Sequence, residues 1–194
     1  DIGAEAYRVG PVPDDAAQLT ATLEDQLVRA DLIITTGGVS AGAYDTVKAV
    51  LSQLGTVEFT SIAMQPGKPQ GYGTLGETPI FTLPGNPVSA YVSFEVFVRP
   101  VLRRFLGYNE LFRPMVEARV TNAFDSPAAK RQYARGQLAY QNGDWTFHPS
   151  MSQGSHQVGV LAHANAIAVV PEEVEHVPAN STVTVMRLDT DHGA

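Results

Sequence analysis

A glycine-rich stretch between an apolar run and an amphipathic segment constrains the fold more than any other part of this sequence. It reads Thr-Thr-Gly-Gly-Val-Ser-Ala-Gly-Ala-Tyr-Asp over residues 35–45. The apolar run at 31–34 is typical of a buried strand, and residues 46–54 place their apolar side chains on one helical face. A strand followed by a glycine loop and then by a helix indicates an open α/β sheet. Such sheets bind ligands outside the carboxyl ends of their strands.

The loop has a composition that suits an anionic ligand. Its three glycines let backbone N–H groups approach an anion, and the start of the following helix adds partial positive charge. Asp45 is placed either to cap that helix or to hold a cation beside a phosphate. The residues alone leave both interpretations open: a helix cap in a tight turn, or a ligand site.

Alternating strand and helix patterns extend from the N-terminus to about residue 107. A helix capped by Asp14 or Asp15 is predicted from leucines that recur every four residues, and a strand over 4–9 would precede it in a parallel crossover. Gly55 and Gly107 are predicted to stop the second and last helices of this half. Further strands are predicted over 57–64 and 79–83, and Pro100 should kink or split the last helix.

Two proline-containing loops follow predicted strands in this half. The loop at 65–69 is stiff because two prolines fix φ, and it presents Lys68 as a candidate anion ligand. In the loop at 84–89, Asn86 is a good N-cap and Pro87 suits the first helical position. Ser89 lies in the first turn of that helix, where the pattern favours a capping serine over an anion ligand.

The second half of the chain changes to short strands. The Asn142-Gly143 pair predicts a hairpin turn, and the strands together predict a small β-barrel or sandwich. The domains are therefore expected at residues 1–109 and 110–194. The predicted strands of this second domain are 115–120, 132–140, 145–147, 166–170 and 182–186.

Composition narrows the function classes. The net charge of −7 argues against general nucleic-acid binding, and the absence of cysteine excludes disulfides and thiolate metal sites. The absence of cysteine also fits a cytoplasmic protein, and no apolar run is long enough to span a membrane. Between residues 99 and 135, eight basic residues stand against three acidic ones, a local charge of +5; most are expected at the solvated surface.

The five histidines lack metal-ligand spacing. A hydrolase built on Ser40, His156 and Asp45 is disfavoured because the sequence has no G-x-S-x-G motif.

The order of the motifs resembles one family. Gly37 to Gly42 with Asp45, then Pro66 to Pro69, then Leu83 to Ser89 resemble the molybdopterin molybdenumtransferase (MoeA) family. The segments 133–136 and 153–156 resemble that family's C-terminal β domain. The resemblance implies an α/β domain with a parallel-type sheet flanked by helices, like the related molybdopterin adenylyltransferases (MogA-like), followed by an all-β domain.

The resemblance also implies a reaction and a set of site residues. Members of the family insert molybdate into adenylylated molybdopterin and release AMP, with magnesium as the usual divalent cation. Asp45 and Lys68 are then expected to be catalytic, with Asp45 as the magnesium ligand. Molybdate is expected at the junction of the two domains. The expected molybdate ligands are Lys68, Ser89, Arg135 and Ser155, and the expected molybdopterin-binding residues are Gly37, Gly38, Ser40, Gly42, Gly85, Asn86 and Pro87.

The sequence also departs from the family pattern. Two further domains and a Gly-Asp-Glu-Leu loop precede the corresponding region in family members, so the chain is expected to be a C-terminal fragment, and Gln65 stands where many relatives carry lysine. A homodimer of the full-length protein and contact with the adenylyltransferase are implied partners. Two alternatives stay open: an adenylyltransferase-like enzyme, which would make AMP esters, and a non-catalytic binding or assembly module.

Overall fold

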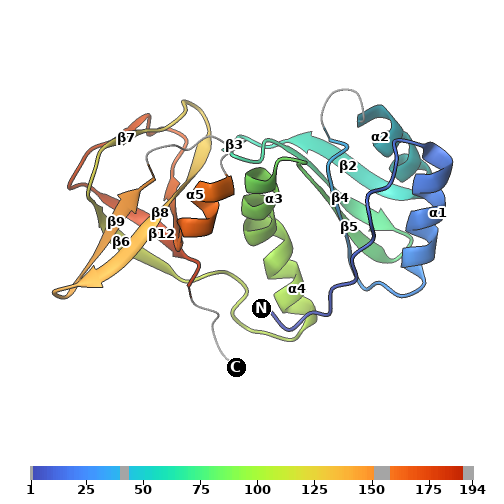
Figure 1. The fold of residues 1–194 in the computed structure, drawn as a ribbon, viewed down its shortest axis with the longest axis horizontal. Coiled ribbons are helices and arrows are strands. Elements are labelled where there is room, and N and C mark those ends of the chain that lie inside the picture. Colours follow the sequence, from blue (N-terminus) through green and yellow to red (C-terminus); the bar gives the residue numbers. More distant parts are fainter. Residues whose placement is uncertain (1, 40–43, 151–157, 190–194) are drawn as a thin grey trace. The chain divides into compact units, whose positions relative to one another are not determined.

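The computed structural model describes residues 2–39, 44–150 and 158–189 (Figure 1). The chain forms two compact units. The α/β unit comprises Glu5–Ile62 and Gly67–Ser93, and the barrel unit comprises Asp1–Ala4, Ala63–Pro66 and Phe94–Ala194. The domain boundary between residues 109 and 110 stays a prediction.

The sheet of the α/β unit is mixed, which corrects the expectation of a parallel-type sheet. Its strand order is β1 (Ile33–Thr36), β5 (Thr78–Leu83), β4 (Pro69–Leu75) and β2 (Gly55–Ser61). Only β1 and β5 pair in parallel, because β4 runs antiparallel to both of its neighbours. A tight turn at Gly76, with φ +59°, joins β4 directly to β5, and so short a connection permits only antiparallel pairing.

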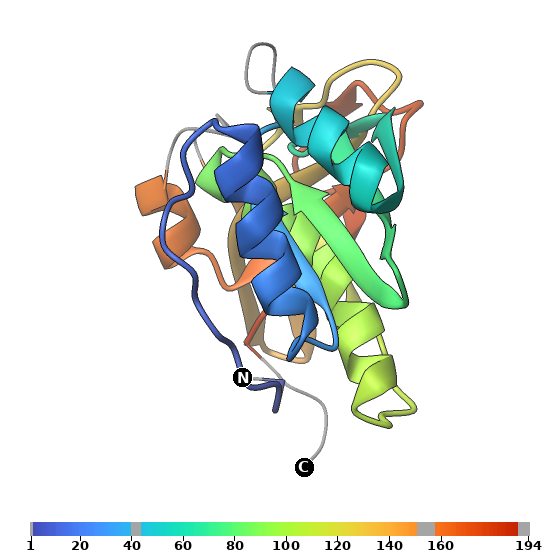
Figure 2. The same cartoon turned by 90° about the vertical axis from the view of Figure 1, so that its right-hand side faces the viewer.

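Three helices of this unit lie on the two faces of the sheet. Helices α1 (Ala16–Leu27) and α2 (Tyr44–Leu54) lie side by side on one face, and α3 (Pro87–Ser93) lies on the other (Figures 1 and 2). The core under α1 and α2 buries Leu23, Val50, Leu51 and Ile80. Asp15 caps α1 as predicted, because its Oδ1 accepts a hydrogen bond of 2.9 Å from the N–H of Gln18.

Two predictions for the α/β half are wrong. Residues 4–9 form no strand, so no parallel crossover leads from them into α1. Gly55 is not a left-handed residue after α2 but the first residue of β2. An added Cβ at Gly55 would overlap the carbonyl oxygen of Thr74, so glycine is needed there for the close approach of β2 and β4.

The long helical segment after Asn86 is split, as predicted. It consists of α3, the π-helical turn η1 (Phe94–Val98) and α4 (Arg99–Phe105). The irregular turn comes just before Pro100, which lacks the N–H that a continuous α-helix would need. The segment ends at Gly107, whose φ of +82° and N–H bond of 3.1 Å to the carbonyl of Arg104 confirm the predicted stop.

The predicted strands of the second half close into a five-stranded barrel. The order is β10 (Ala166–Val170), β12 (Thr182–Arg187), β6 (Met115–Val120), β9 (Asp144–Pro149) and β8 (Arg131–Gln141), and β8 pairs again with β10. Asn142 and Gly143 both have positive φ, as the predicted hairpin turn requires. Three short strands and a helix complete this unit: β3 (Met64–Gln65), β7 (Phe124–Asp125), β11 (His176–Val177) and α5 (Val158–His163).

Several basic residues expected at the surface are buried. Of the eight between residues 99 and 135, only Arg104, Arg119 and Arg131 are exposed. Arg99 and Arg103 are 1% and 2% exposed.

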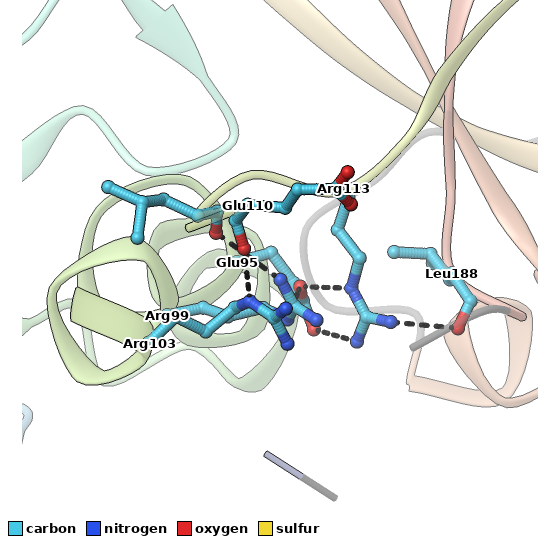
Figure 3. Close-up of polar contacts among 7 residues, drawn as sticks. Glu95, Arg99, Arg103, Glu110, Arg113 and Leu188 are labelled. Carbon is cyan, nitrogen blue, oxygen red and sulfur yellow. Dashed lines mark hydrogen bonds and ion pairs between the residues drawn. The ribbon is translucent and has the colours of Figure 1, made fainter. Parts of the chain in front are cut away.

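Figure 3 shows how these buried arginines are held in the barrel unit. Arg113 makes a bidentate contact of 2.9 and 3.1 Å with the Glu95 carboxylate, and Arg99 Nε lies 3.6 Å from the same group. Arg103 Nε donates to the carbonyl oxygen of Glu110 at 2.6 Å. Burial of these charges is tolerated because each guanidinium meets a carboxylate or a carbonyl.

Candidate functional site

The two predicted ligand loops of the α/β unit lie side by side. Strands β1 and β5 are parallel neighbours, and their last residues, Thr36 and Leu83, are opposite each other. The N–H of Gly37 donates a hydrogen bond of 3.0 Å to the carbonyl oxygen of Leu83. The glycine loop and the loop that begins at Pro84 therefore leave the sheet together at one edge, where α/β sheets bind ligands.

Glycine is required at this edge for two reasons. Gly37 and Gly38 have φ values of +91° and +72°, a region that side-chain-bearing residues rarely adopt. A Cβ added at Gly38 would overlap the Val47 side chain of α2, and one at Gly85 would lie 3.2 Å from the Cα of Gly37. The approach of Gly85 to Gly37 brings two backbone segments close together, which suits an anion-binding loop.

Of the two helices that begin at this edge, α3 starts as the sequence predicts, whereas α2 begins at Tyr44, before the expected residue 46. The Oδ1 atom of Asn86 accepts a hydrogen bond of 3.1 Å from the N–H of Val88, and Pro87 is the first residue of α3. Asn86 therefore caps α3, as predicted. Ser89 is 6% exposed in the first turn of α3. On the other helix, Asp45 is the second residue of α2.

Lys68 is exposed on the loop that enters β4. Its carbonyl oxygen accepts a hydrogen bond of 2.8 Å from the N–H of Ile62, across the loop. The preceding Gly67 is buried with φ +107°, so the turn before Lys68 requires glycine. The backbone of Lys68 is thus fixed, while its ammonium group is accessible to an anion.

Sequence reasoning missed a buried polar pair beside Lys68. The side chain of Gln70 in β4 bonds to Ser93 at the end of α3 and to the carbonyl oxygen of Gly67. Its only signal in the sequence is a glutamine directly after the predicted loop at 65–69. A hydrogen bond between residues 23 positions apart leaves no periodic pattern.

Arg135 lies in the barrel unit and is fully buried. It stands opposite Ile167 of β10, and its neighbour Ala134 points into the barrel core, so Arg135 is on the outer side of β8. Burial lowers the pKa of Arg135, but an arginine stays charged at neutral pH even so.

The other predicted site residues lie outside the described part of the chain. They are Ser40, Gly42, and Ser155 with the polar loop at 151–156.

The described residues include no group of three or more histidine, aspartate or glutamate side chains that could hold a metal ion. A protein cage for a metal is therefore not found in this part of the chain. Magnesium, however, usually binds through one or two carboxylates together with substrate phosphates.

None of the described helices is long and apolar enough to cross a membrane.

Comparisons with known proteins agree with this arrangement. A family model described as "Probable molybdopterin binding domain" matches residues 1–104, and one described as "MoeA C-terminal region (domain IV)" matches residues 117–188. Relatives include "Molybdopterin molybdenumtransferase 2" of Mycobacterium tuberculosis, 45% identical over 97% of this chain and 47% of its own length.

"Molybdopterin molybdenumtransferase 1" of the same organism is 40% identical over all of this chain and 47% of its own. The chain thus spans about half the length of these curated relatives. A crystal structure of the molybdopterin biosynthesis MoeA protein from Pyrococcus horikoshii has a TM-score of 0.75 and 28% identity, covering 93% of this chain and 43% of that one. The chain belongs to the MoeA family and corresponds to its C-terminal portion, a molybdopterin-binding domain followed by the MoeA C-terminal domain.

Proposed function

We propose that this chain provides part of the active site of a molybdopterin molybdenumtransferase. The reaction takes molybdate and adenylylated molybdopterin as substrates, places molybdenum on the two dithiolene sulfurs and releases AMP. The observation that carries the proposal is the pairing of the two loops. The glycine loop and the Pro84 loop lie together at the ends of parallel strands, in a chain that also matches the MoeA C-terminal domain.

The loop edge has the chemistry that a phosphate-bearing pterin needs. Gly37 and Gly85 let the two loops approach each other, and the backbone near Gly38 and Gly85 is proposed to bind the phosphate, with Asn86 and Pro87 opening the second helix. Ser40 and Gly42 complete the proposed molybdopterin-binding set. Asp45, in the first turn of α2, is proposed to hold magnesium at the phosphates. Magnesium bound there would neutralise charge on the phosphates as AMP leaves.

Molybdate is a tetrahedral dianion that needs cationic and hydroxyl donors. We propose Lys68 and Ser89 as its ligands from the α/β unit, with Lys68 also acting on the substrate oxygens as a fixed positive charge. Arg135 and Ser155 are proposed to contribute from the second domain. The guanidinium of Arg135 remains charged when buried, which suits a desolvated oxyanion site.

The barrel favours the transferase over an adenylyltransferase-like enzyme. Residues 117–188 match the MoeA C-terminal domain, whereas the glycine loop and Asp45 alone would suit both enzymes. The proposal also includes a homodimer for the complete protein, contact with the adenylyltransferase that supplies its substrate, and a cytoplasmic location. Neither nucleic acid nor a membrane has a role in it.

Asp45→Asn tests the proposed reaction. In the protein that carries this chain, we expect the variant to lower magnesium-dependent AMP release from adenylylated molybdopterin by about 100-fold or more, because a bound metal supplies several kcal/mol of charge stabilisation. The assay is chromatographic quantification of AMP with and without molybdate. Asp25→Asn, which alters an exposed ion pair on α1, is the matched control and should leave the rate unchanged.

Three outcomes separate the hypotheses. Unchanged AMP release in Asp45→Asn would contradict the role given to Asp45. Formation of AMP esters rather than their consumption would favour the adenylyltransferase. Binding of adenylylated molybdopterin without turnover, in wild type as well as variant, would favour a non-catalytic module.

A further inference from the structure

The side chain of Gln70 connects two segments that carry proposed molybdate ligands. Gln70 is 5% exposed in β4. Its Nε2 atom donates hydrogen bonds of 2.6 Å to the carbonyl oxygen of Gly67 and of 2.5 Å to Ser93 Oγ. A glutamine amide has two N–H donors, so both are used in these contacts.

Each contact lies beside a proposed ligand. Gly67 immediately precedes Lys68, and the carbonyl of Lys68 is bound from the other side by the N–H of Ile62. Ser93 follows Ser89 by four residues, so the two serines share one face of α3. Gln70 therefore joins the Lys68 loop to the helix that carries Ser89, within one unit of the structure.

Accurate placement matters for a lysine that binds an oxyanion. Its ammonium group is a point charge on a flexible four-carbon chain, so only the backbone at its base is fixed by the fold. A displacement of that backbone by about 1 Å is enough to lower the effectiveness of a polar site, in binding or in rate, by one or two orders of magnitude. The base of Lys68 is held by the Ile62 N–H and, through Gly67, by Gln70.

We propose that Gln70 is a positioning residue, which acts on molybdate through Lys68 and does not itself contact it. The inference rests on the proposed function, because it takes molybdate as the ligand of Lys68. A purely structural role would make a different prediction. Loss of the two buried hydrogen bonds would then lower the stability of the protein. Any change in the affinity for molybdate would be the same with and without Lys68.

The test is a double-mutant cycle with Gln70→Met and Lys68→Ala, measured by calorimetric titration of molybdate into the protein that carries this chain. Methionine has nearly the shape of glutamine but no N–H donors. We expect Gln70→Met to weaken molybdate binding about tenfold in the wild-type background. In the Lys68→Ala background, Gln70→Met should change the affinity for molybdate by about twofold or less. A residue that acts through Lys68 has little effect once that lysine is absent.

Ser93→Ala is the second variant, and it guards against a folding defect in Gln70→Met. It removes one of the two contacts and should weaken molybdate binding in the same direction, again only when Lys68 is present. Thermal unfolding of each variant checks that the fold is retained. An unchanged affinity for molybdate in Gln70→Met and Ser93→Ala, or an equal loss of affinity with and without Lys68, overturns this inference and leaves the proposed function standing. A wild-type protein that does not bind molybdate overturns the proposed function and this inference with it.

Discussion

Replacing Glu95 with alanine is expected to destabilise the barrel unit by about 3–5 kcal/mol, the cost of leaving buried charges without their partner. The Glu95 carboxylate is 5% exposed and meets Arg113 in a bidentate contact, with Arg99 3.6 Å away (Figure 3). Removal of the carboxylate leaves both guanidinium groups in a low-dielectric environment. The segment between α4 and β6 would lose its contact with η1, although Arg113 also donates a hydrogen bond to the carbonyl oxygen of Leu188.

The free energy of unfolding in urea measures this effect. Trp145, the single tryptophan of the chain, packs against the barrel core and reports unfolding of that unit by its fluorescence. Glu172→Ala is the matched control, since its ion pair with Arg131 is exposed on both sides and should contribute less than about 1 kcal/mol. A loss below about 1 kcal/mol in Glu95→Ala would show that the buried cluster does not stabilise the unit as we argue.

Gly73→Ala is expected to cost the α/β unit about 3 kcal/mol, at the upper end for overpacked sites. Gly73 lies opposite Val57 in the antiparallel pairing of β2 and β4. An added Cβ would overlap the carbonyl oxygen of Thr56 and lie 2.7 Å from the Cα of Val57. Because the obstacle is backbone, the two strands would have to separate to accommodate a single methyl group.

Amide hydrogen exchange of β2 and β4 together with the thermal midpoint checks this prediction. The variant should lose protection along both strands and melt at a lower temperature. Gly10→Ala is the control, because nothing lies within 4 Å of a Cβ added there. Equal protection in Gly73→Ala and wild type would mean that the β2–β4 pairing differs from the one described here.

The barrel was more predictable than the α/β sheet, and the reason is physical. In β6 and β12 apolar and polar residues alternate because one face of the strand packs in the core, and Asn142-Gly143 specifies the hairpin turn. The strand β4 reads Pro-Gln-Gly-Tyr-Gly-Thr-Leu. Gly73 is required by a close backbone contact with β2, and a Cβ added at Gly71 would lie 3.0 Å from the side chains of Phe59 and Thr82. The two glycines give this strand the composition of a loop. Without β4 in the sheet, a parallel arrangement was the natural expectation.

The candidate site was predictable only where it depends on local backbone chemistry. The glycine loop, the Asn86 cap and the exposed Lys68 follow from residue types at the ends of strands. The Gln70–Ser93 contact could not be predicted, because it joins residues that the fold alone brings together. The partners of Arg99 and Arg103 lie nearer in sequence, a carboxylate four residues before Arg99 and the carbonyl groups of Glu110 and Leu111. The burial of the two arginines was missed because it depends on packing that a run of basic residues does not indicate.

The most direct test of the central claim is a calorimetric titration of molybdate, with sulfate as the competing oxyanion, on this protein and on its Arg135→Ala variant. The proposed site predicts that wild type binds molybdate selectively over sulfate and that the variant loses this selectivity, because a buried guanidinium is then missing from the oxyanion site. Equal affinity of the wild-type protein for both anions would contradict the assignment of these residues to a molybdate site.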